Sequence, residues 1–228
     1  MTPRRPGQFL EEQIQRKAMI AGVCIALAWG LAAAGLEWWP VALAVIPFVF
    51  VVDRQGRNGG RLDASRQLVG LEGERRAGAI LEDLAPRGVL AVHDLDVGRG
   101  NVDHVAISPQ GVFAIEVKHL SGGRFHLRRG IGLMQGSRPA DAHAAQARRS
   151  ATAVHAFLLR SGIDLWVQPM LLSTKAEVWR GGFRIGPVHV LAPDALPDAL
   201  TDGPEQLDEQ QRRRIHRLLV TGDIAASA

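Results

Sequence analysis

Three residues in adjoining segments could together carry out hydrolytic chemistry: Asp103, Glu116 and Lys118. Glu116 and Lys118 interrupt the apolar run "GVFAIEVKHL" at 111–120, which otherwise has the composition of a buried β-strand. Because side chains alternate along a strand, these two charged residues lie on the same face. Carboxylates can bind a hard divalent metal, and a lysine beside them can orient a water molecule or stabilise charge on a phosphate. We therefore expect a metal-dependent hydrolytic site here.

The position of Asp103 depends on the turn between two predicted strands, "VDHVAI" and "VFAIEVKHL". If Pro109 and Gln110 form a two-residue loop, Asp103 lies directly opposite Glu116, and the repulsion between their carboxylates calls for a cation. A three-residue loop with Gly111 in a left-handed bulge would instead send the two carboxylates to opposite faces. The hydrolytic chemistry favours the first register, but the turn sequence alone leaves both open.

A third acidic residue, Glu74, lies on the predicted core-facing stripe of a helix. In "GLEGERRAGAILEDL" it precedes Ala77 by three residues and Leu81 by seven, where an apolar side chain is expected. Two interpretations remain open. Glu74 could complete the acidic site, or it could be a first-turn acid that complements the helix dipole.

The elements that must position these residues follow from hydrophobic periodicity. A helix is predicted from about residue 68, with its apolar side chains at helical spacing, and "APRG" ends it. The strands follow as "VLAVHDLDV", then "VDHVAI" and "VFAIEVKHL" after a turn at "GRGN", with "GRFHLRR" as a further candidate strand. A helix over 140–159, the strands "DLWVQPMLLS" and "PVHVLAP", and a last helix over 204–220 complete the order. This order predicts one α/β domain over 68–220, in which helices pack against a mixed central sheet.

At these residues the sequence resembles a known family. The stretches "GLEGE", "NVDHVAISPQGVFAIEVKHLSGG" and "AHAAQARRSATAVHAFL" are similar to the nuclease-related domain (NERD) family, a branch of the PD-(D/E)xK nuclease superfamily. The resemblance covers roughly 68–192. It implies a restriction-endonuclease-like core in which a mixed central sheet flanked by helices carries the catalytic acids.

The resemblance also implies roles for individual residues. Asp103 and Glu116 would bind Mg²⁺, with Mn²⁺ as the alternative ion, and Lys118 would assist the attacking water. Glu74 would match the acid of the first helix. Gln146 would match the polar residue on the helix after the sheet. The implied substrate is nucleic acid, with DNA favoured over RNA.

The N-terminal region has the composition of a membrane segment. Residues 18–52 contain a single charged side chain, Glu37, which stands in "GLEWWPVA" beside two tryptophans and Pro40. A straight helix of this length would extend about 52 Å, against a hydrocarbon core of about 30 Å. We therefore predict a transmembrane hairpin at 18–52. A single tilted span, a cleaved signal peptide and a buried soluble hairpin are the alternatives.

The flanks of this segment predict its orientation. Residues 1–17 form a basic N-terminus, and 53–67 a polar, glycine-rich linker that also carries arginines. Positive residues stay on the cytoplasmic side. The chain is thus expected to be a multi-pass protein of the bacterial inner membrane, in contact with the lipid bilayer through 18–52, with its soluble domain facing the cytoplasm.

Composition and the other motifs exclude several classes of function. The net charge of +4 is compatible with nucleic acid or an anionic membrane surface, and the lone Cys24 excludes an intramolecular disulfide. The sequence has no glycine-rich phosphate loop and no zinc-ligand spacing. His104 is predicted to point away from Asp103 as a hydrogen-bonded core histidine. Arg124, Arg128 and Arg129 could contact phosphates or form a solvated strand.

Two functions follow from these observations. The leading one is a membrane-anchored, Mg²⁺-dependent nuclease that hydrolyses phosphodiester bonds. The alternative is a non-catalytic, membrane-anchored module that binds nucleic acid or protein on a nuclease-like scaffold.

Overall fold

The computed structural model describes residues 60–97 and 101–222, together with Gln15, Met19 and Val23. A boundary between two compact units lies between Val69 and Gly70, and the unit from Gly70 onward carries every predicted site residue. The predicted hairpin at 18–52 lies outside the described residues, apart from Met19 and Val23, which are helical. Among the helices that are described, none has both the length and the apolar character needed to cross a bilayer.

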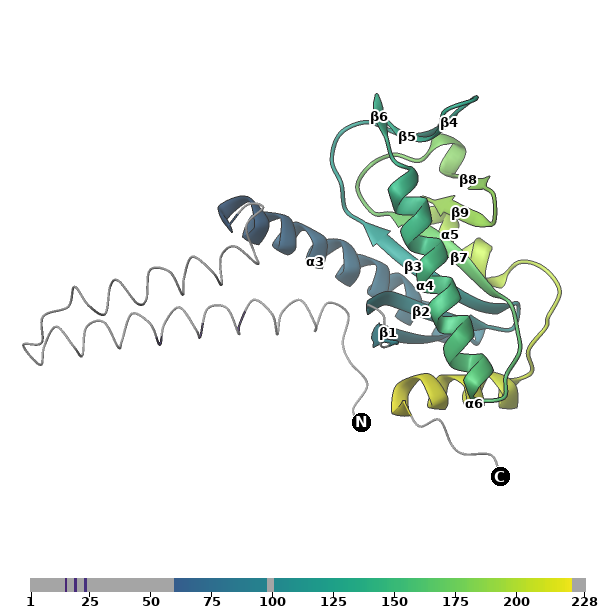
Figure 1. The fold of residues 1–228 in the computed structure, drawn as a ribbon. Helices are drawn as coiled ribbons and strands as arrows, with labels where there is room; N and C mark the ends of the chain where they lie inside the picture. The colour runs from purple at the N-terminus through teal and green to yellow at the C-terminus, as the bar shows by residue number, and fades with distance from the viewer. Residues whose placement is uncertain (1–14, 16–18, 20–22, 24–59, 98–100, 223–228) are drawn as a thin grey trace, which may run out of the picture. The chain divides into compact units, whose positions relative to one another are not determined.

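A six-stranded mixed sheet forms the centre of the domain (Figure 1), in the order β1-β2-β3-β7-β9-β8. The three central strands β3, β7 and β9 run parallel to one another. The other pairs of the sheet, β1–β2, β2–β3 and β8–β9, are antiparallel. The strands are β1 (Leu90–Asp96), β2 (Asn101–Ser108), β3 (Gly111–Lys118), β7 (Val167–Ser173), β8 (Gly182–Ile185) and β9 (Val188–Leu191). The predicted mixed α/β architecture is confirmed, and it fits a nuclease-like core.

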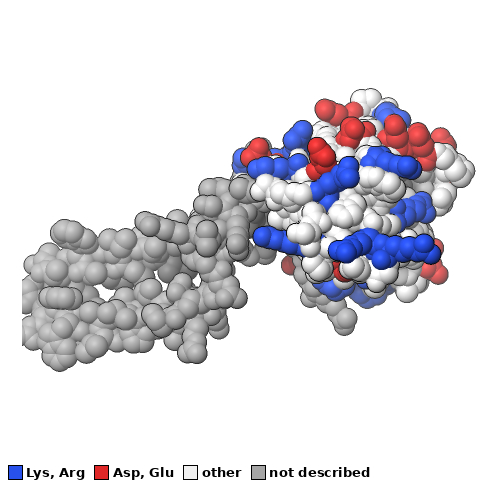
Figure 2. Space-filling model, turned by 90° about the horizontal axis from the view of Figure 1, so that it is seen from above, with Lys and Arg blue, Asp and Glu red and all other residues white. Residues whose placement is uncertain are grey.

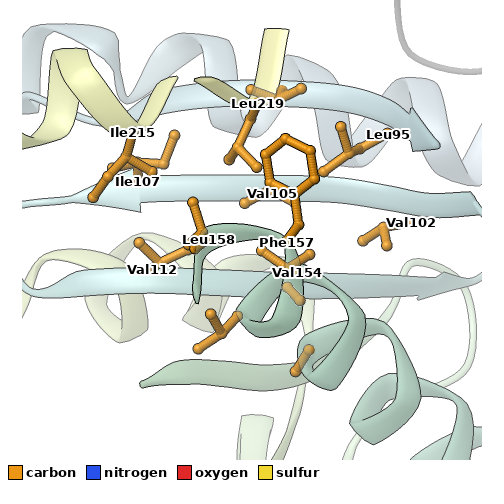
Figure 3. Close-up of a cluster of buried hydrophobic side chains, with 14 of the residues drawn as sticks. Leu95, Val102, Val105, Ile107, Val112, Val154, Phe157, Leu158, Ile215 and Leu219 are labelled. Atoms are coloured by element: carbon orange, nitrogen blue, oxygen red, sulfur yellow. The ribbon is translucent and has the colours of Figure 1, made fainter. Parts of the chain in front are cut away.

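Helices cover both faces of the sheet. Helix α3 (Gly60–Asp83) and the short α5 (Leu196–Thr201) pack on one face through Leu81, Leu196 and their neighbours. Helix α4 (Asp141–Arg160) and α6 (Glu209–Thr221) pack on the other. Figure 3 shows this second layer, where the apolar side chains of α4 and α6 meet those of β1, β2 and β3. The two layers remove the apolar faces of the sheet from water, which is the main stabilising contribution to the fold.

A second, three-stranded sheet stands beside the central one. It consists of β4 (Phe125–Arg128), β5 (Gly132–Gln135) and β6 (Arg138–Pro139). Phe125 and Leu133 are fully buried against the first turns of α4. The segment "GRFHLRR" does form a strand, as predicted, but that strand belongs to this separate sheet.

Several predicted boundaries were wrong. Helix α3 begins at Gly60, so the end of the predicted linker at 53–67 is helical; the run after Gly60 contains good helix formers. The last helix begins at Glu209, because Asp208 caps it and forms a reciprocal capping box with Gln211. Strand β8, helix α5, and the 3₁₀ turns η1 (Ala85–Arg87), η2 (Trp179–Gly181) and η3 (Pro193–Ala195) were not predicted. The predicted turn at "GRGN" includes residues 98–100, which lie outside the described part.

Candidate functional site

The β2–β3 hairpin has the register that brings the predicted acids together. Ser108 pairs with Gly111 and His104 with Ile115, so Pro109 and Gln110 form a two-residue turn. The Ser108 Oγ accepts a hydrogen bond from the Gln110 backbone N–H at 3.1 Å, which holds the turn. The two-residue register is confirmed and the three-residue alternative is wrong.

Asp103 lies where β2 separates from β3, because the pairing of the two strands ends at His104. Its Oδ2 accepts a hydrogen bond of 2.7 Å from the backbone N–H of Val117, a donor that would otherwise require a backbone partner. Burial raises the pKa of Asp103 well above its ordinary value, and the carboxylates of Glu116 and Glu74 raise it further. The Val117 hydrogen bond and the Lys118 ammonium oppose that rise. Asp103 therefore lies close to two other carboxylates, at the point where β2 and β3 cease to pair.

Glu116 and Lys118 form a close ion pair on β3. The Lys118 Nζ lies 2.7 Å from Glu116 Oε1, and the Ser150 hydroxyl of α4 donates to Glu116 Oε2 at 3.4 Å. Glu116 is only 1% exposed, whereas the side chain of Lys118 is 19% exposed. A buried carboxylate needs such partners. The pair therefore presents one ammonium at the surface of the site above a fully enclosed carboxylate.

Helix α3 brings Glu74 to the site through a close approach at Gly73. A Cβ on Gly73 would lie 2.5 Å from the Cβ of His119 and 2.9 Å from Thr174 Oγ1, so only glycine fits at this contact. Arg76 adds an anchor by donating to the Thr174 carbonyl at 3.2 Å. These contacts hold the middle of α3 against the ends of β3 and β7.

The electrostatics of Glu74 reflect this placement. Burial raises its pKa from 4.5 to about 7, and the carboxylates of Asp94 and Glu116 add to the rise, while Lys118 opposes it. The three predicted acids therefore lie within electrostatic reach of one another and of the lysine. The interpretation of Glu74 as a first-turn helix acid is wrong, because α3 begins at Gly60.

Asp94 is a residue of this cluster that the sequence reasoning missed. It is 3% exposed, its backbone is left-handed with φ 51°, and its Oδ1 accepts a hydrogen bond from Asn101 Nδ2 at 3.2 Å. The pairing of β1 with β2 is interrupted at Asp94 and resumes one residue later. Its signal was an acid inside the apolar run "VLAVHDLDV", the same kind of signal that drew attention to Glu116.

Helix α4 contributes polar groups from the other face of the sheet. Ser150, a second residue missed from the sequence, contacts Glu116 directly, and Gln146 lies one helical turn earlier on the same helix face. Within the part of the chain that the structure describes, the Gln146 amide makes no hydrogen bond to the acids. His143 lies further along this face, and burial and the Lys118 ammonium both lower its pKa.

Comparison with known proteins agrees with this geometry. Residues 69–174 match the family model of the nuclease-related domain, and the matched segment contains Glu74, Asp103, Glu116, Lys118 and Gln146. This segment is a nuclease-related domain. The predicted resemblance is thus confirmed. No curated protein matches the chain, and no solved structure does either.

Within the nuclease-related domain, His104 occupies the face of β2 turned away from the acids. It is fully buried, and its Nδ1 lies 2.8 Å from Nδ1 of His93. Burial and the neighbouring His93 lower the pKa of His104 to about 3. The prediction of a hydrogen-bonded core histidine is confirmed: a neutral imidazole held in the sheet supports the strand that carries Asp103.

The side chains of this nuclease-related domain fit a cation that needs few protein ligands. Among the described residues, no three His, Cys, Asp or Glu side chains are arranged closely enough to enclose a metal ion by themselves. The site does offer hard carboxylate oxygens, and burial first and repulsion between the carboxylates second raise the pKa of Glu74 and Asp103. Mg²⁺ binds through one or two carboxylates and keeps several of its waters for substrate phosphates to replace. The donor set fits that mode of binding.

Proposed function

We propose that this chain is a divalent-metal-dependent nuclease that hydrolyses phosphodiester bonds of nucleic acid, with DNA as the favoured substrate. The observation that carries the proposal is the grouping of Glu74, Asp103 and Glu116 around Lys118 at the end of β3 in a nuclease-related domain. Burial and the neighbouring carboxylates raise the pKa of Glu74 and of Asp103, so keeping these acids ionised contributes unfavourably to folding. A catalytic use is a reason to retain such an arrangement.

The metal ligands in this proposal are Asp103 and Glu116, with Mg²⁺ as the cation and Mn²⁺ as a substitute. Their carboxylates supply hard oxygen donors of the kind this ion prefers. When bound, the cation would supply a water of lowered pKa and would offset the negative charge of the scissile phosphate.

The remaining residues have roles that follow from their positions. The Lys118 ammonium is partly exposed above Glu116 and can donate to a phosphate oxygen or orient a water molecule. Glu74, with a pKa of about 7, can take up or release a proton near neutral pH. Ser150 keeps Glu116 oriented, and Gln146 lies on the helix face that borders the site.

The proposal includes an anchor in the bacterial inner membrane. Residues 18–52 would form the transmembrane hairpin in contact with lipid, and the basic flanks would keep the nuclease-related domain in the cytoplasm. Such a tether would confine the enzyme to nucleic acid near the membrane.

The proposal is tested with a fragment that begins at Gly60 and therefore keeps helix α3 whole. It is incubated with labelled single- and double-stranded DNA and RNA in Mg²⁺, Mn²⁺ or EDTA, beside its Glu116→Gln and Lys118→Ala variants. Thr152→Ala, on the exposed side of α4, is the matched control. We expect metal-dependent cleavage that both site variants lose and the control keeps. Cleavage that persists in EDTA, or in both site variants, would refute the proposal.

One observation favours the non-catalytic binding module. Lys118 already neutralises Glu116 at 2.7 Å, so the carboxylate has a cationic partner without any metal. A folded fragment that cuts no substrate and takes up no Mg²⁺ or Mn²⁺ in titration calorimetry would identify the chain as this module.

A further inference from the structure

The β4–β6 sheet is a strongly basic part of the domain. Residues 121–140 contain four arginines and no acidic residue, in a chain whose total net charge is +4. All four side chains are exposed, and within the described part of the chain none of them forms an ion pair. They are Arg124, Arg128, Arg129 and Arg138. A group of exposed positive side chains without acidic partners attracts a polyanion.

This sheet is attached directly to the candidate site. The loop after Lys118 leads into β4, and the loop after β7 begins at Thr174, whose backbone N–H donates to the Lys118 carbonyl at 3.1 Å. The two loops are joined where the Phe125 N–H donates to the Glu177 carbonyl at 2.8 Å. In Figure 1 the β4–β6 sheet lies beyond the end of the central sheet at which β3 and β7 end. Figure 2 looks down on that end of the domain and shows several Lys and Arg side chains in a row along one side of it.

The sheet is also held rigidly. Gly123 and Gly136 approach so closely that a Cβ on Gly123 would lie 2.6 Å from the Gly136 backbone, and both have positive φ. The side chain of Asp141, at the first position of α4, accepts a hydrogen bond from the Leu133 N–H at 2.9 Å. A binding surface held this firmly loses little conformational entropy when a ligand docks.

An exposed aromatic residue completes the surface. Trp179 in η2 follows Val178, which bridges to Phe125 of β4, and Trp179 remains 38% exposed. The Arg180 guanidinium lies 4.6 Å from the centre of the Trp179 ring, with Arg180 in the left-handed backbone region at φ 57°. Aromatic rings backed by arginine beside a basic surface are the features on which unpaired bases stack.

We propose that the β4–β6 sheet and the Trp179–Arg180 stack hold a single strand of nucleic acid as it leaves the site. The four arginines contact successive phosphates, and a base stacks at Trp179. This inference rests on the proposed function, because it assigns the substrate of the same site as unpaired strand rather than closed duplex. The same charges would also attract an anionic membrane surface. The position of the basic sheet next to the acids favours nucleic acid, because a substrate must reach the acids and a membrane need not.

The test measures binding without cleavage. The full chain is purified in a mild detergent with Glu116→Gln as background and EDTA present. Three probes are used: a labelled, non-self-complementary DNA oligonucleotide, its duplex, and vesicles of phosphatidylglycerol. Affinity is measured by fluorescence anisotropy, or by co-sedimentation for vesicles, over a range of salt concentrations. The variants are Arg128→Gln/Arg129→Gln and Trp179→Ala. Arg214→Gln/Arg217→Gln, on exposed positions of α6, removes the same charge elsewhere.

The expected results differ between the variants. Each lost phosphate contact lowers the steepness of the logarithmic salt dependence by about 0.7 for single strands, so the Arg128/Arg129 pair should lower it by about 1.4. Trp179→Ala should weaken single-strand binding by about 5-fold to about 150-fold without changing the salt dependence. The α6 control should change neither quantity.

Three outcomes would overturn the inference. In the first, the Arg128/Arg129 variant loses no more affinity for the single strand than the α6 control does. In the second, the duplex binds more tightly than the single strand and Trp179→Ala has no effect. In the third, the variants lose affinity only for the vesicles. Cleavage by the chain with Glu116 intact is measured separately. If cleavage is absent while binding depends on these residues, the nuclease proposal fails and the binding surface stands. If the chain cleaves nucleic acid but binding does not depend on these residues, the nuclease proposal stands and the binding surface is refuted.

Discussion

Glu74→Gln is expected to make the protein more stable at alkaline pH while it impairs the site. The pKa of Glu74 is about 7 in the folded protein, and in the unfolded chain it returns to about 4.5. Below pH 4.5 the carboxyl is protonated in both states and contributes no pH dependence. Between these values the unfolded chain loses the proton first, so the free energy of unfolding falls as pH rises. Above pH 7 the loss is complete.

The magnitude follows from the two pKa values. One pKa unit corresponds to about 1.4 kcal/mol, so the rise from 4.5 to about 7 corresponds to about 3 kcal/mol. This is an upper figure, because Glu74 is partly exposed and solvent screens its charge. Glutamine has a similar shape and no charge, so Glu74→Gln should recover about 1–3 kcal/mol above pH 7 and almost nothing below pH 4.5.

The assay is urea unfolding of the fragment from Gly60, followed by far-ultraviolet circular dichroism below pH 4.5 and above pH 7. Glu72→Gln, an exposed change on the same helix, is the control and should give a smaller gain. If Glu74→Gln changes the free energy of unfolding equally at both pH values, the argument from burial and like charge is refuted. Added Mg²⁺ should stabilise the wild type more than Glu74→Gln, because the cation would offset the same repulsion.

Three further predictions concern the contacts that support the site. Gly73→Ala should lower stability by about 1–3 kcal/mol and reduce cleavage, because its Cβ would meet a side chain at 2.5 Å; Gly70→Ala, with nothing within 4 Å, should instead stabilise α3 by about 0.5–1 kcal/mol in urea unfolding. Ser150→Ala should cost about 1–3 kcal/mol by removing a hydrogen bond from buried Glu116, and should lower kcat in the cleavage assay; unchanged stability would contradict the buried contact. Asp208→Ala should lower the free energy of unfolding by about 1 kcal/mol, because it removes the cap of α6, and should leave cleavage by the folded protein unchanged. A lower kcat in this variant would show that reduced stability by itself affects the cleavage assay.

The sequence by itself determined the features that depend on local periodicity. Alternation along a strand places Glu116 and Lys118 on one face whatever the surroundings. The turn sequence left the register of Asp103 open between two alternatives, and the observed two-residue turn at Pro109 and Gln110 decided it. The helical spacing from Leu71 to Leu84 likewise predicted the buried stripe of α3.

Only the tertiary structure decided which distant groups join them. Asp94 lies on β1 and Ser150 on α4, and no local pattern reports that each reaches the carboxylates of another element. Gly73 reads as an unfavourable helix residue until the close approach of His119 explains it. The sequence of β4 is equally compatible with a solvated strand, and only the fold shows that the loops to the β4–β6 sheet start at the ends of β3 and β7. Periodicity acts within one element, whereas burial and electrostatic repulsion depend on contacts between elements, which only the folded chain brings together.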